Sequence, residues 1–431
     1  AFGILALSVL ASCSVQQKVQ KTVKTSEVKR IISTLAADDM QGRAAFGPGI
    51  EKAATFIEHE FQKIGLQKLE GESSYRQTFN VTRIRPAEVS AEINAQRVNG
   101  NDLMVVSDMP SFSWNSLNEV EVVKIEAGQQ LFGRYREILA MNKPVLVLVD
   151  RQYADAFARL RANTMRGRIV QEVKDSNAAA VFVLGGTEPT SIRVNFTNTI
   201  EKSPLFNVAG MLKGKSRPDE IVVFSGHYDH IGVVKPLEGD SIANGADDDA
   251  SGTTAVIALA KHYKKMANNE RTLIFIAFTA EEIGGYGSRY FSSRVDPADV
   301  VAMFNIEMIG KESKFGRNAG FITGYERSDF GKILQKNLEG TEFTFHPDPY
   351  PEQQLFYRSD NATLAALGVP AHTISTDKID QDKFYHIVND ELETIDVDII
   401  TTAIRAIALS ARSIIDGTDT PTRIPPLEGR K

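Results

Sequence analysis

The chain has 431 residues, of which 42% are hydrophobic and 24% are charged, and its formal net charge is -6 at pH 7. This is the composition of a globular protein, and the length predicts two domains rather than one. The acidic balance excludes the positive field that gathers phosphate backbones, so we expect no nucleic-acid partner. The single cysteine excludes an internal disulfide.

An apolar run over residues 1–12, followed by Cys13, is the first feature along the chain. The run has the length of a signal-peptide core and is too short to span a bilayer, which needs about 20 apolar residues. The stretch Leu10-Ala-Ser-Cys13 resembles the lipobox of bacterial lipoproteins, in which the chain is cut before an acylated cysteine. This resemblance implies an exported lipoprotein at the outer membrane, facing the periplasm or the cell surface, with a membrane contact only through Cys13. The alternative is a buried N-terminal element with an inert thiol.

Hydrophobic periodicity predicts helices and then a sheet. Two amphipathic helices are expected over residues 28–35 and 50–64, and Gly65 ends the second. After Gly210, short apolar runs alternate with helical patterns, which is typical of a mainly parallel, mixed α/β sheet with helices on both faces. The expected strands are 221–224, 273–278, 300–306, 321–323 and 371–374, and further helices are expected around Val256 and over 399–407.

A change of pattern over residues 88–203 predicts a smaller inserted α/β domain. Its strand-like runs and its helix-like stretch resemble the protease-associated domain that is inserted in some secreted peptidases. The three prolines and few large apolar residues of the C-terminal end predict a loosely ordered tail. The expected organisation is therefore a signal peptide over 1–12, a tether over 13–25, a main domain over 26–87 and 204–416, the insert over 88–203, and the tail over 417–431.

Side chains of the types that can bind metals follow several of the expected strands. His227 and Asp229 come directly after the run 221–224, and ligands bind at the carboxyl ends of strands in open α/β sheets. We expect the Asp229 carboxylate to accept the imidazole N–H of His227 and to fix its tautomer for metal binding. Alone, such a pair is more often a surface pair or a satisfied core histidine.

Three adjacent aspartates, residues 247–249, lie between Gly245 and Gly252 just before an expected helix. Their mutual repulsion is costly unless water or a cation neutralises it. The alternative is a helix N-terminus, where carboxylates interact favourably with the helix dipole.

Acids also follow the next two strands. Glu281 and Glu282 come after the run 273–278 and Glu307 after 300–306, while His386 follows a later strand pattern. Neighbouring glutamates diverge, so that one can bind a metal while the other faces water as a general base. These side chains are expected to meet at one edge of the sheet.

The ordered series of His-x-Asp, Asp-Asp-x-Ser-Gly, Glu-Glu, an acid before Met-Ile-Gly, and Tyr-His resembles the family of co-catalytic two-zinc aminopeptidases and glutamate carboxypeptidases. The resemblance spans nearly all of residues 204–416, and the segment Asp39-Met-Gln-Gly-Arg43 resembles the N-terminal part of that family. It implies a metallo-exopeptidase that acts on a peptide substrate with two Zn²⁺ per chain. The roles that it implies are zinc ligands at His227 and Glu307, at Glu282 and His386, and at the bridging Asp248, a general base at Glu281, and an oxyanion donor at Tyr385.

One position departs from the family pattern. Glu307 stands where aminopeptidases of this type usually have aspartate, so the resemblance implies hydrolysis of N-terminal peptide bonds but leaves a carboxypeptidase or dipeptidase open. Glutaminyl cyclase chemistry and a non-catalytic binding protein on the same fold are further alternatives. Packing beneath the sheet edge is the alternative for Tyr385. Residues 358–361 resemble the specificity loop of the family, and the sequence does not reveal the oligomeric state.

Overall fold

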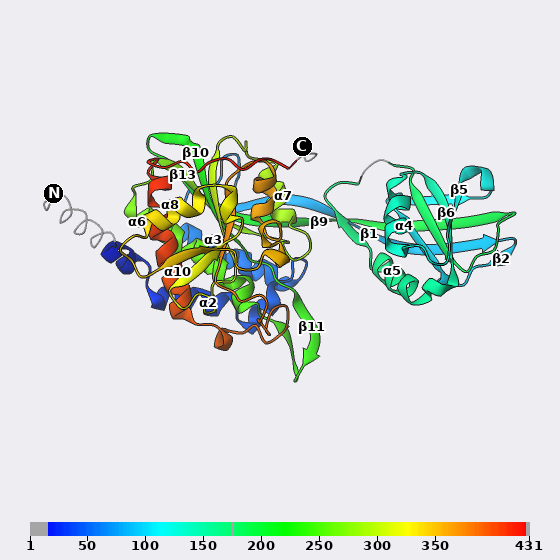
Figure 1. Ribbon diagram of the computed structural model, residues 1–431, viewed down its shortest axis with the longest axis horizontal. Helices are drawn as coiled ribbons and strands as arrows, with labels where there is room; N and C mark the ends of the chain where they lie inside the picture. The colour runs from blue at the N-terminus through cyan, green and yellow to red at the C-terminus, as the bar shows by residue number, and fades with distance from the viewer. Residues whose placement is uncertain (1–15, 174–175, 428–431) are drawn as a thin grey trace. The chain divides into compact units, whose positions relative to one another are not determined.

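The structure is a computed structural model that describes residues 16–173 and 176–427 (Figure 1). The chain divides into a larger unit, formed by the residues up to Phe79 and from Leu205 onward, and an inserted unit, Asn80–Pro204. The expected insert began at residue 88, but strand β1 (Arg76–Ile93) runs without interruption through that position. The expected signal peptide and lipid-anchor cysteine, residues 1–13, lie outside the described residues.

The larger unit is built on a mixed sheet, which confirms the expected α/β fold. Its central strands β13, β10, β14 and β17 run parallel to one another, while β9 is antiparallel to β13, and β15 is antiparallel to β17 but parallel to β16. Phe224 on β10 stacks on rings of both neighbouring strands, with centroid distances of 5.5 and 4.8 Å. The strand order is β16 (Thr344–Pro347), β15 (Ala319–Ile322), β17 (Ala371–Ser375), β14 (Val300–Ile306), β10 (Arg217–His227), β13 (Arg271–Phe278) and β9 (Ile192–Leu212).

Helices cover both faces of this sheet. The buried apolar face of α6 packs with α2, α3, α8 and α10 into one hydrophobic cluster, and α7 and α9 contribute Phe291 and Leu364 to a second cluster. The expected amphipathic helices are present, and α3 ends at Gly65 in the left-handed conformation that glycine adopts without steric cost. The helices are α2 (Thr25–Leu35), α3 (Pro48–Ile64), α6 (Gly252–Met266), α7 (Tyr286–Ser292), α8 (Phe330–Asn337), α9 (Asn361–Ala366), α10 (Val397–Ser410) and α11 (Arg412–Ile415).

The inserted unit has an α/β core of its own. Its four-stranded sheet has the order β3-β8-β6-β5, and hydrophobic clusters lie on both faces. Trp114 and Phe157 are buried in these two clusters. The elements are β3 (Leu103–Ser107), β5 (Glu121–Ile125), β6 (Pro144–Val149) and β8 (Ala179–Leu184), helices α4 (Leu131–Ala140) and α5 (Ala154–Arg166), and the short strands β2 (Gln96–Arg97), β4 (Ser111–Trp114) and β7 (Arg168–Val170).

Two expectations about the ends of the chain are wrong for the described residues. The expected polar tether is helical over residues 16–22, and it buries Val19 and Val23 in the core of the larger unit because these apolar residues recur at helical spacing. The expected loose tail buries Ile424, whose N–H donates to the Gly368 carbonyl over 3.1 Å, and Arg271 donates to the Asp419 carbonyl over 2.7 Å. No helix among the described residues is long and apolar enough to cross a membrane.

Candidate metal centre

The carboxyl ends of three parallel strands carry the candidate site. His227 is the last residue of β10, Glu282 follows β13 by four residues, and Glu307 directly follows β14. Because these strands are parallel neighbours, their ends meet at one edge of the sheet. The structure therefore brings together side chains that are 80 residues apart in the sequence.

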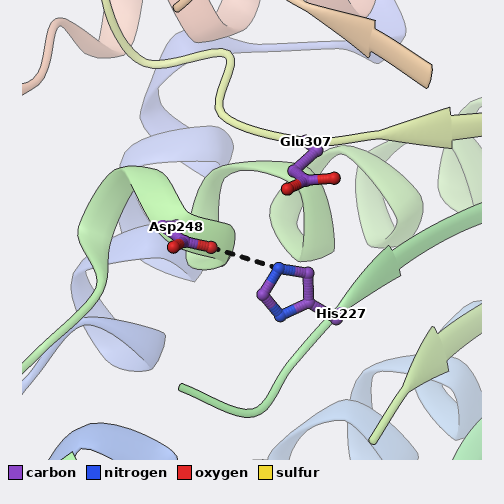
Figure 2. Close-up of side chains that lie close together, drawn as sticks. All are labelled: His227, Asp248 and Glu307. Atoms are coloured by element: carbon purple, nitrogen blue, oxygen red, sulfur yellow. Dashed lines mark ion pairs between the residues drawn. The ribbon is translucent and has the colours of Figure 1, made fainter. Parts of the chain in front are cut away.

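A first group of possible metal ligands consists of His227, Asp248 and Glu307, whose ligand atoms all lie within 4.8 Å of one another (Figure 2). The imidazole Nε2 of His227 is 3.1 Å from Asp248 Oδ1. All three side chains are buried or half-buried, so few waters compete for their ligand atoms.

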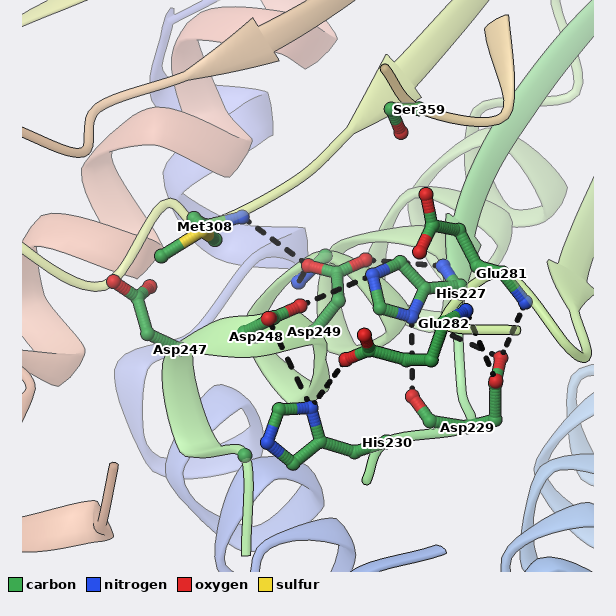
Figure 3. Close-up of polar contacts among 12 residues, drawn as sticks. His227, Asp229, His230, Asp247, Asp248, Asp249, Glu281, Glu282, Met308 and Ser359 are labelled. Atoms are coloured by element: carbon green, nitrogen blue, oxygen red, sulfur yellow. Dashed lines mark hydrogen bonds and ion pairs between the residues drawn. The ribbon is translucent and has the colours of Figure 1, made fainter. Parts of the chain in front are cut away.

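A second group shares Asp248 with the first. His386 Nε2 is 3.2 Å from Asp248 Oδ2 and 3.0 Å from Glu282 Oε2. His230, which the sequence analysis missed, places Nδ1 2.7 Å from Glu282 Oε1 and 3.8 Å from Asp248 Oδ2. Figure 3 shows the Asp248 carboxylate between the rings of His227 and His230. The five residues named as ligands thus lie together, with Asp248 common to both groups.

The three adjacent aspartates have different partners, which separates Asp248 from its neighbours. Asp249 accepts the backbone N–H groups of His227 and Met308 over 3.0 and 3.2 Å. Asp247 accepts the Gly310 N–H over 2.7 Å. Both side chains therefore hold backbone in place, and only the Asp248 carboxylate contacts the histidines.

The turn that carries these aspartates packs tightly on β14. At Gly252, the first residue of α6, a Cβ would lie 2.0 Å from the Ile306 carbonyl oxygen. A larger residue would push the turn away from the strand that leads to Glu307. The glycine of the Asp-Asp-x-Ser-Gly pattern thus allows a close approach of backbone at the site.

The expected role of the Asp229 carboxylate is wrong. His227 Nδ1 lies 3.0 Å from the backbone carbonyl oxygen of Asp229, and the nearest carboxylate oxygen is 3.9 Å away. The carboxylate instead accepts the N–H groups of Glu281 and Glu282 over 3.1 and 3.4 Å. The tautomer of His227 is therefore fixed by a carbonyl, while the Asp229 side chain positions the turn that carries both glutamates (Figure 3).

The site has the electrostatic properties of a cation site. Burial raises the pKa of Glu281 well above its usual range, and it raises the pKa of Glu307 to about 7. Burial opposes ionisation of Asp248 as well, but hydrogen bonds with His227 and His386 hold its pKa well below the usual value. Such a cluster of carboxylates gains stability when a cation binds.

Buried polar atoms without partners support the same conclusion. His230 Nε2 and Glu307 Oε2 are buried and have no hydrogen-bond partner, while His227 Nε2 faces the Asp248 carboxylate over 3.1 Å. Imidazole nitrogens and carboxylate oxygens are the donor atoms that Zn²⁺ binds in catalytic sites. The residues present thus fit a metal of this kind.

A pocket opens beside the first group. It is lined by Glu307 and Tyr385, by apolar side chains that include Phe321 and Leu355, and by the exposed Arg358 at the specificity-loop position. The Tyr385 ring stacks on His386 with centroids 3.9 Å apart, and burial raises the pKa of its hydroxyl. Tyr385 therefore both packs against a candidate ligand and faces the pocket.

The sequence analysis did not identify two further buried acids near the site. Both carboxylate oxygens of Asp360 are buried without a hydrogen-bond partner, and Asp390 accepts the N–H groups of Asp247 and Asp248 over 3.0–3.1 Å. Neither acid follows a strand directly, which was the signal used for the other residues. For His230 there was such a signal, since it lies three residues after His227 at the same strand end.

Comparison with known proteins identifies relatives of this chain. Residues 207–411 match the model of Peptidase family M28. A probable zinc metalloprotease of Pyricularia oryzae is 32% identical over 155 residues, which are 34% of this chain and 30% of that protein. Aminopeptidase YwaD of Bacillus subtilis is 29% identical over 119 residues, 27% of this chain and 23% of the relative. The chain spans less than a third of the length of the curated relatives that it matches.

Solved structures share the fold over almost the whole chain. An aminopeptidase from Aneurinibacillus sp. strain AM-1 superposes with a TM-score of 0.54 at 18% identity, covering 96% of this chain and 98% of the other. BSAP, a zinc aminopeptidase from Bacillus subtilis, gives a TM-score of 0.55 at 16% identity and covers 92% and 96%. At these identities the likeness concerns the fold alone.

Proposed function

Because residues 207–411 belong to peptidase family M28, we propose that this protein is a zinc-dependent exopeptidase, and specifically an aminopeptidase. The observation that carries the proposal is the pair of acid–imidazole groups that share Asp248, with Glu281 beside them. A shared carboxylate between two ligand groups is the arrangement that holds two metal ions a few ångströms apart.

In this proposal the chain holds two zinc ions. His227 and Glu307 would hold one ion, Glu282 and His386 would hold the other, and Asp248 would be shared by both. Zinc in this position supplies Lewis acidity and lowers the pKa of a water ligand. His230 lies within hydrogen-bond distance of Glu282 and orients the Glu282 carboxylate.

Glu281 and Tyr385 carry out the proton chemistry. The Glu281 carboxylate takes the proton from the attacking water and gives it to the leaving amine, so that one buried carboxyl serves as base and then as acid. Its position is set by the hydrogen bond from its N–H to Asp229. The Tyr385 hydroxyl donates to the oxyanion that forms on the substrate carbonyl.

The charge around the pocket favours an aminopeptidase over a carboxypeptidase. Glu307 lines the pocket, and the buried carboxylate of Asp360 lies close enough to raise the pKa of both Glu307 and Glu281, after the larger effect of burial. Arg358 is the one cationic side chain among the described lining residues, and it is exposed. An excess of carboxylate attracts the free ammonium of a peptide N-terminus and repels a C-terminal carboxylate.

The test compares matched peptides with zinc-loaded protein. A peptide with a free N-terminus should lose its first residue, and the same peptide with an acetylated N-terminus should remain intact. Metal analysis should return two zinc ions per chain, and removing them with a chelator should abolish cleavage. Cleavage of the acetylated peptide from its C-terminus would replace the aminopeptidase by a carboxypeptidase, and formation of pyroglutamate from an N-terminal glutamine would indicate a cyclase.

We also propose that the protein is an exported lipoprotein anchored at Cys13. The proposal is supported by the apolar run before the cysteine and its likeness to a lipobox. Full-length protein expressed in a bacterium should fractionate with membranes and incorporate labelled fatty acid, and Cys13→Ala should abolish both. Release of the wild-type protein without acylation would contradict the proposal.

A further inference from the structure

Asp377 is a buried carboxyl in the pocket that the proposed mechanism does not use. It follows β17 by two residues and is 3% exposed. Both of its carboxylate oxygens are buried and have no hydrogen-bond partner. It lines the same pocket as Glu307 and Tyr385.

The surroundings of Asp377 contain two acids and one lysine that pairs with both of these acids. The carboxylates of Asp247 and Asp382 lie near it, with one oxygen of each of the three residues within 4.8 Å of the others. Lys311 pairs with Asp382 over 2.6 Å and with Asp247 over 3.4 Å. Among the described residues, no ion pair within 4.0 Å includes Asp377. The charge of Lys311 lowers the pKa of Asp377, but Lys311 pairs directly with Asp382 and Asp247 instead.

Ionising a buried carboxyl group that has no ion-pair partner is unfavourable in free energy, and a cationic ligand beside it makes the ionised form more stable. Burial, followed by the charges of Asp247 and Asp382, raises the pKa of Asp377 to about 8. A cation that enters the pocket restores the ionised form and forms a charge-assisted hydrogen bond in a region of low dielectric. The interaction with Asp377 therefore favours the binding of a cationic ligand over that of a neutral one.

The walls of the pocket suit a long side chain with an apolar stem. Phe321, Leu355 and Ile379 supply apolar surface, and Thr323 and Ser375 supply hydroxyl groups. Lysine and arginine side chains bury their methylene groups on such surfaces and keep their charged ends at a polar partner. A side chain of this type matches apolar walls that include one carboxylate.

We propose that Asp377 is a specificity residue that binds the ammonium or guanidinium group of the N-terminal side chain of the substrate, so that the enzyme prefers peptides beginning with lysine or arginine. This inference rests on the proposed function, because it places the N-terminal residue in the pocket beside Glu307. Arg358 is the one described cation that also lines the pocket, and it is exposed and directed to Gln353 over 3.4–3.5 Å. Its repulsion is therefore screened by solvent.

The test uses p-nitroanilides of lysine, arginine, leucine and norleucine, since norleucine has the methylene stem of lysine without the ammonium. The wild-type protein should show a kcat/KM at least about tenfold higher for lysine than for norleucine. Asp377→Asn should lower kcat/KM for lysine and arginine by about 10- to 100-fold, the value of a hydrogen bond to a charged group. Cleavage of norleucine should stay within about threefold, which also shows that the variant is folded.

Asp380→Asn is the matched control. Asp380 lies three residues after Asp377, and its side chain is exposed and does not line the pocket. Its replacement also removes one negative charge, but the ratio of kcat/KM for lysine to that for norleucine should not change. Equal cleavage of lysine and norleucine by the wild type, or an equal loss on both in Asp377→Asn, would overturn the proposal. A third result would also overturn the proposal: the lysine-to-norleucine ratio is the same in Asp377→Asn as in the wild type, and Ca²⁺ stabilises the wild type against unfolding but not the variant. Asp377 would then belong to a cation site with Asp247 and Asp382.

A binding measurement separates this inference from the proposed function. L-lysinamide and L-norleucinamide are titrated calorimetrically into the zinc-loaded wild type and Asp377→Asn. Tighter binding of lysinamide that is lost in the variant supports the role of Asp377 even if the protein cleaves none of the four anilides, which would contradict the proposed function alone. Equal affinity for both amides overturns the inference whether or not the protein is a peptidase.

Discussion

The two units of this protein bury different kinds of side chain. Among the described residues of the inserted unit, the buried polar side chains are Thr82 and Ser107, and none is charged. The larger unit buries many ionisable side chains, among them Arg43, His227, Asp229, His230, Asp247, Asp248, Asp249, His262, Arg271, Asp360, His372, Asp377 and Asp390. An apolar core needs only packing, whereas buried charges require partners that are specific for each group.

The ion pairs of the inserted unit illustrate the other half of the contrast. Lys124 pairs with Glu188 and Lys143 pairs with Glu121, and at least 45% of each of these side chains is exposed. Solvent screens such pairs, which contribute about 0–1 kcal/mol to stability. The charged side chains of these pairs therefore lie at the surface of the inserted unit, whereas many buried charged side chains of the larger unit lie at the candidate metal centre. Equivalent substitutions in the two units should consequently have very different effects.

The largest difference is expected for a Glu→Gln substitution. Glu281→Gln removes the proposed general base without changing the size of the side chain, so kcat should fall by about 10²- to 10⁴-fold. Glu188→Gln should leave kcat unchanged, because it removes only an exposed pair with Lys124. Steady-state kinetics on an aminoacyl anilide measures both, and zinc content should stay at the wild-type value in each. Full activity of Glu281→Gln would show that another group accepts the proton.

An Asp→Asn substitution at the shared ligand is expected to release metal. Asp248→Asn weakens both groups at once, because its two oxygens face His227 and His386 respectively. Bound zinc measured by mass spectrometry after dialysis should fall by at least half. The control Asp155→Asn changes an exposed residue of α5 and should keep the full zinc content. If Asp248→Asn also kept two ions per chain, a bridging role would be excluded.

The contrast between the units also explains what the sequence predicts well. The strands at 300–306 and 273–278 are apolar runs, interrupted only by Asn305, that are buried on both faces, and the structure has β14 and β13 at these positions. The residues directly after such strands were found because the carboxyl ends of parallel strands meet at one edge. His227, Glu282 and Glu307 lie together for this reason, whereas Asp248 comes from the turn before α6 and His386 from the loop after β17.

Side chains placed by loops were not predictable in this way. Asp360 and Asp390 lie in segments without periodicity, and their burial depends on contacts that only the folded chain defines. Asp377 follows β17 by two residues, so the strand-end signal was available for it but was not used. The prediction that the Asp229 carboxylate is the partner of His227 was wrong. The spacing of two residues between His227 and Asp229 does not distinguish the carboxylate of Asp229 from its backbone carbonyl. Tertiary packing likewise decided that the residues around Val19 and Ile424 are buried.

An Arg→Met substitution tests whether buried charge stabilises the larger unit. Arg43 is fully buried and donates to the carbonyls of Leu35, Tyr228, Asn244 and Gly245 over 2.5–2.9 Å. Arg43→Met keeps the apolar stem but leaves these acceptors without a donor, which should lower the free energy of unfolding by about 3 kcal/mol. Arg193→Met, in an exposed pair with Glu92 in the inserted unit, should change it by less than about 0.5 kcal/mol. Equal effects in chemical denaturation would show that the four hydrogen bonds contribute little.

The smallest expected effect is a dependence of stability on pH that belongs to the larger unit alone. All seven histidines lie outside residues 80–204. His262 is 3% exposed, its Nδ1 is 2.6 Å from Thr22 Oγ1, and burial lowers its pKa to about 4. Because this pKa lies below the usual value of 6.5, the unfolded chain binds the proton first, and stability is lost as the pH falls through 6.5 towards 4.

The difference between the wild type and His262→Gln isolates this effect from the other titrating groups. From pH 7 to pH 5 the free energy of unfolding of the wild type should fall by about 2 kcal/mol more than that of the variant. Circular dichroism follows the whole protein, while the fluorescence of the single tryptophan, Trp114, reports on the inserted unit. The shift should therefore appear in the dichroism transition and leave the fluorescence transition of the histidine-free unit in place. A shift of equal size in both signals would mean that the two units unfold together, and the contrast between their cores would then have no counterpart in their stabilities.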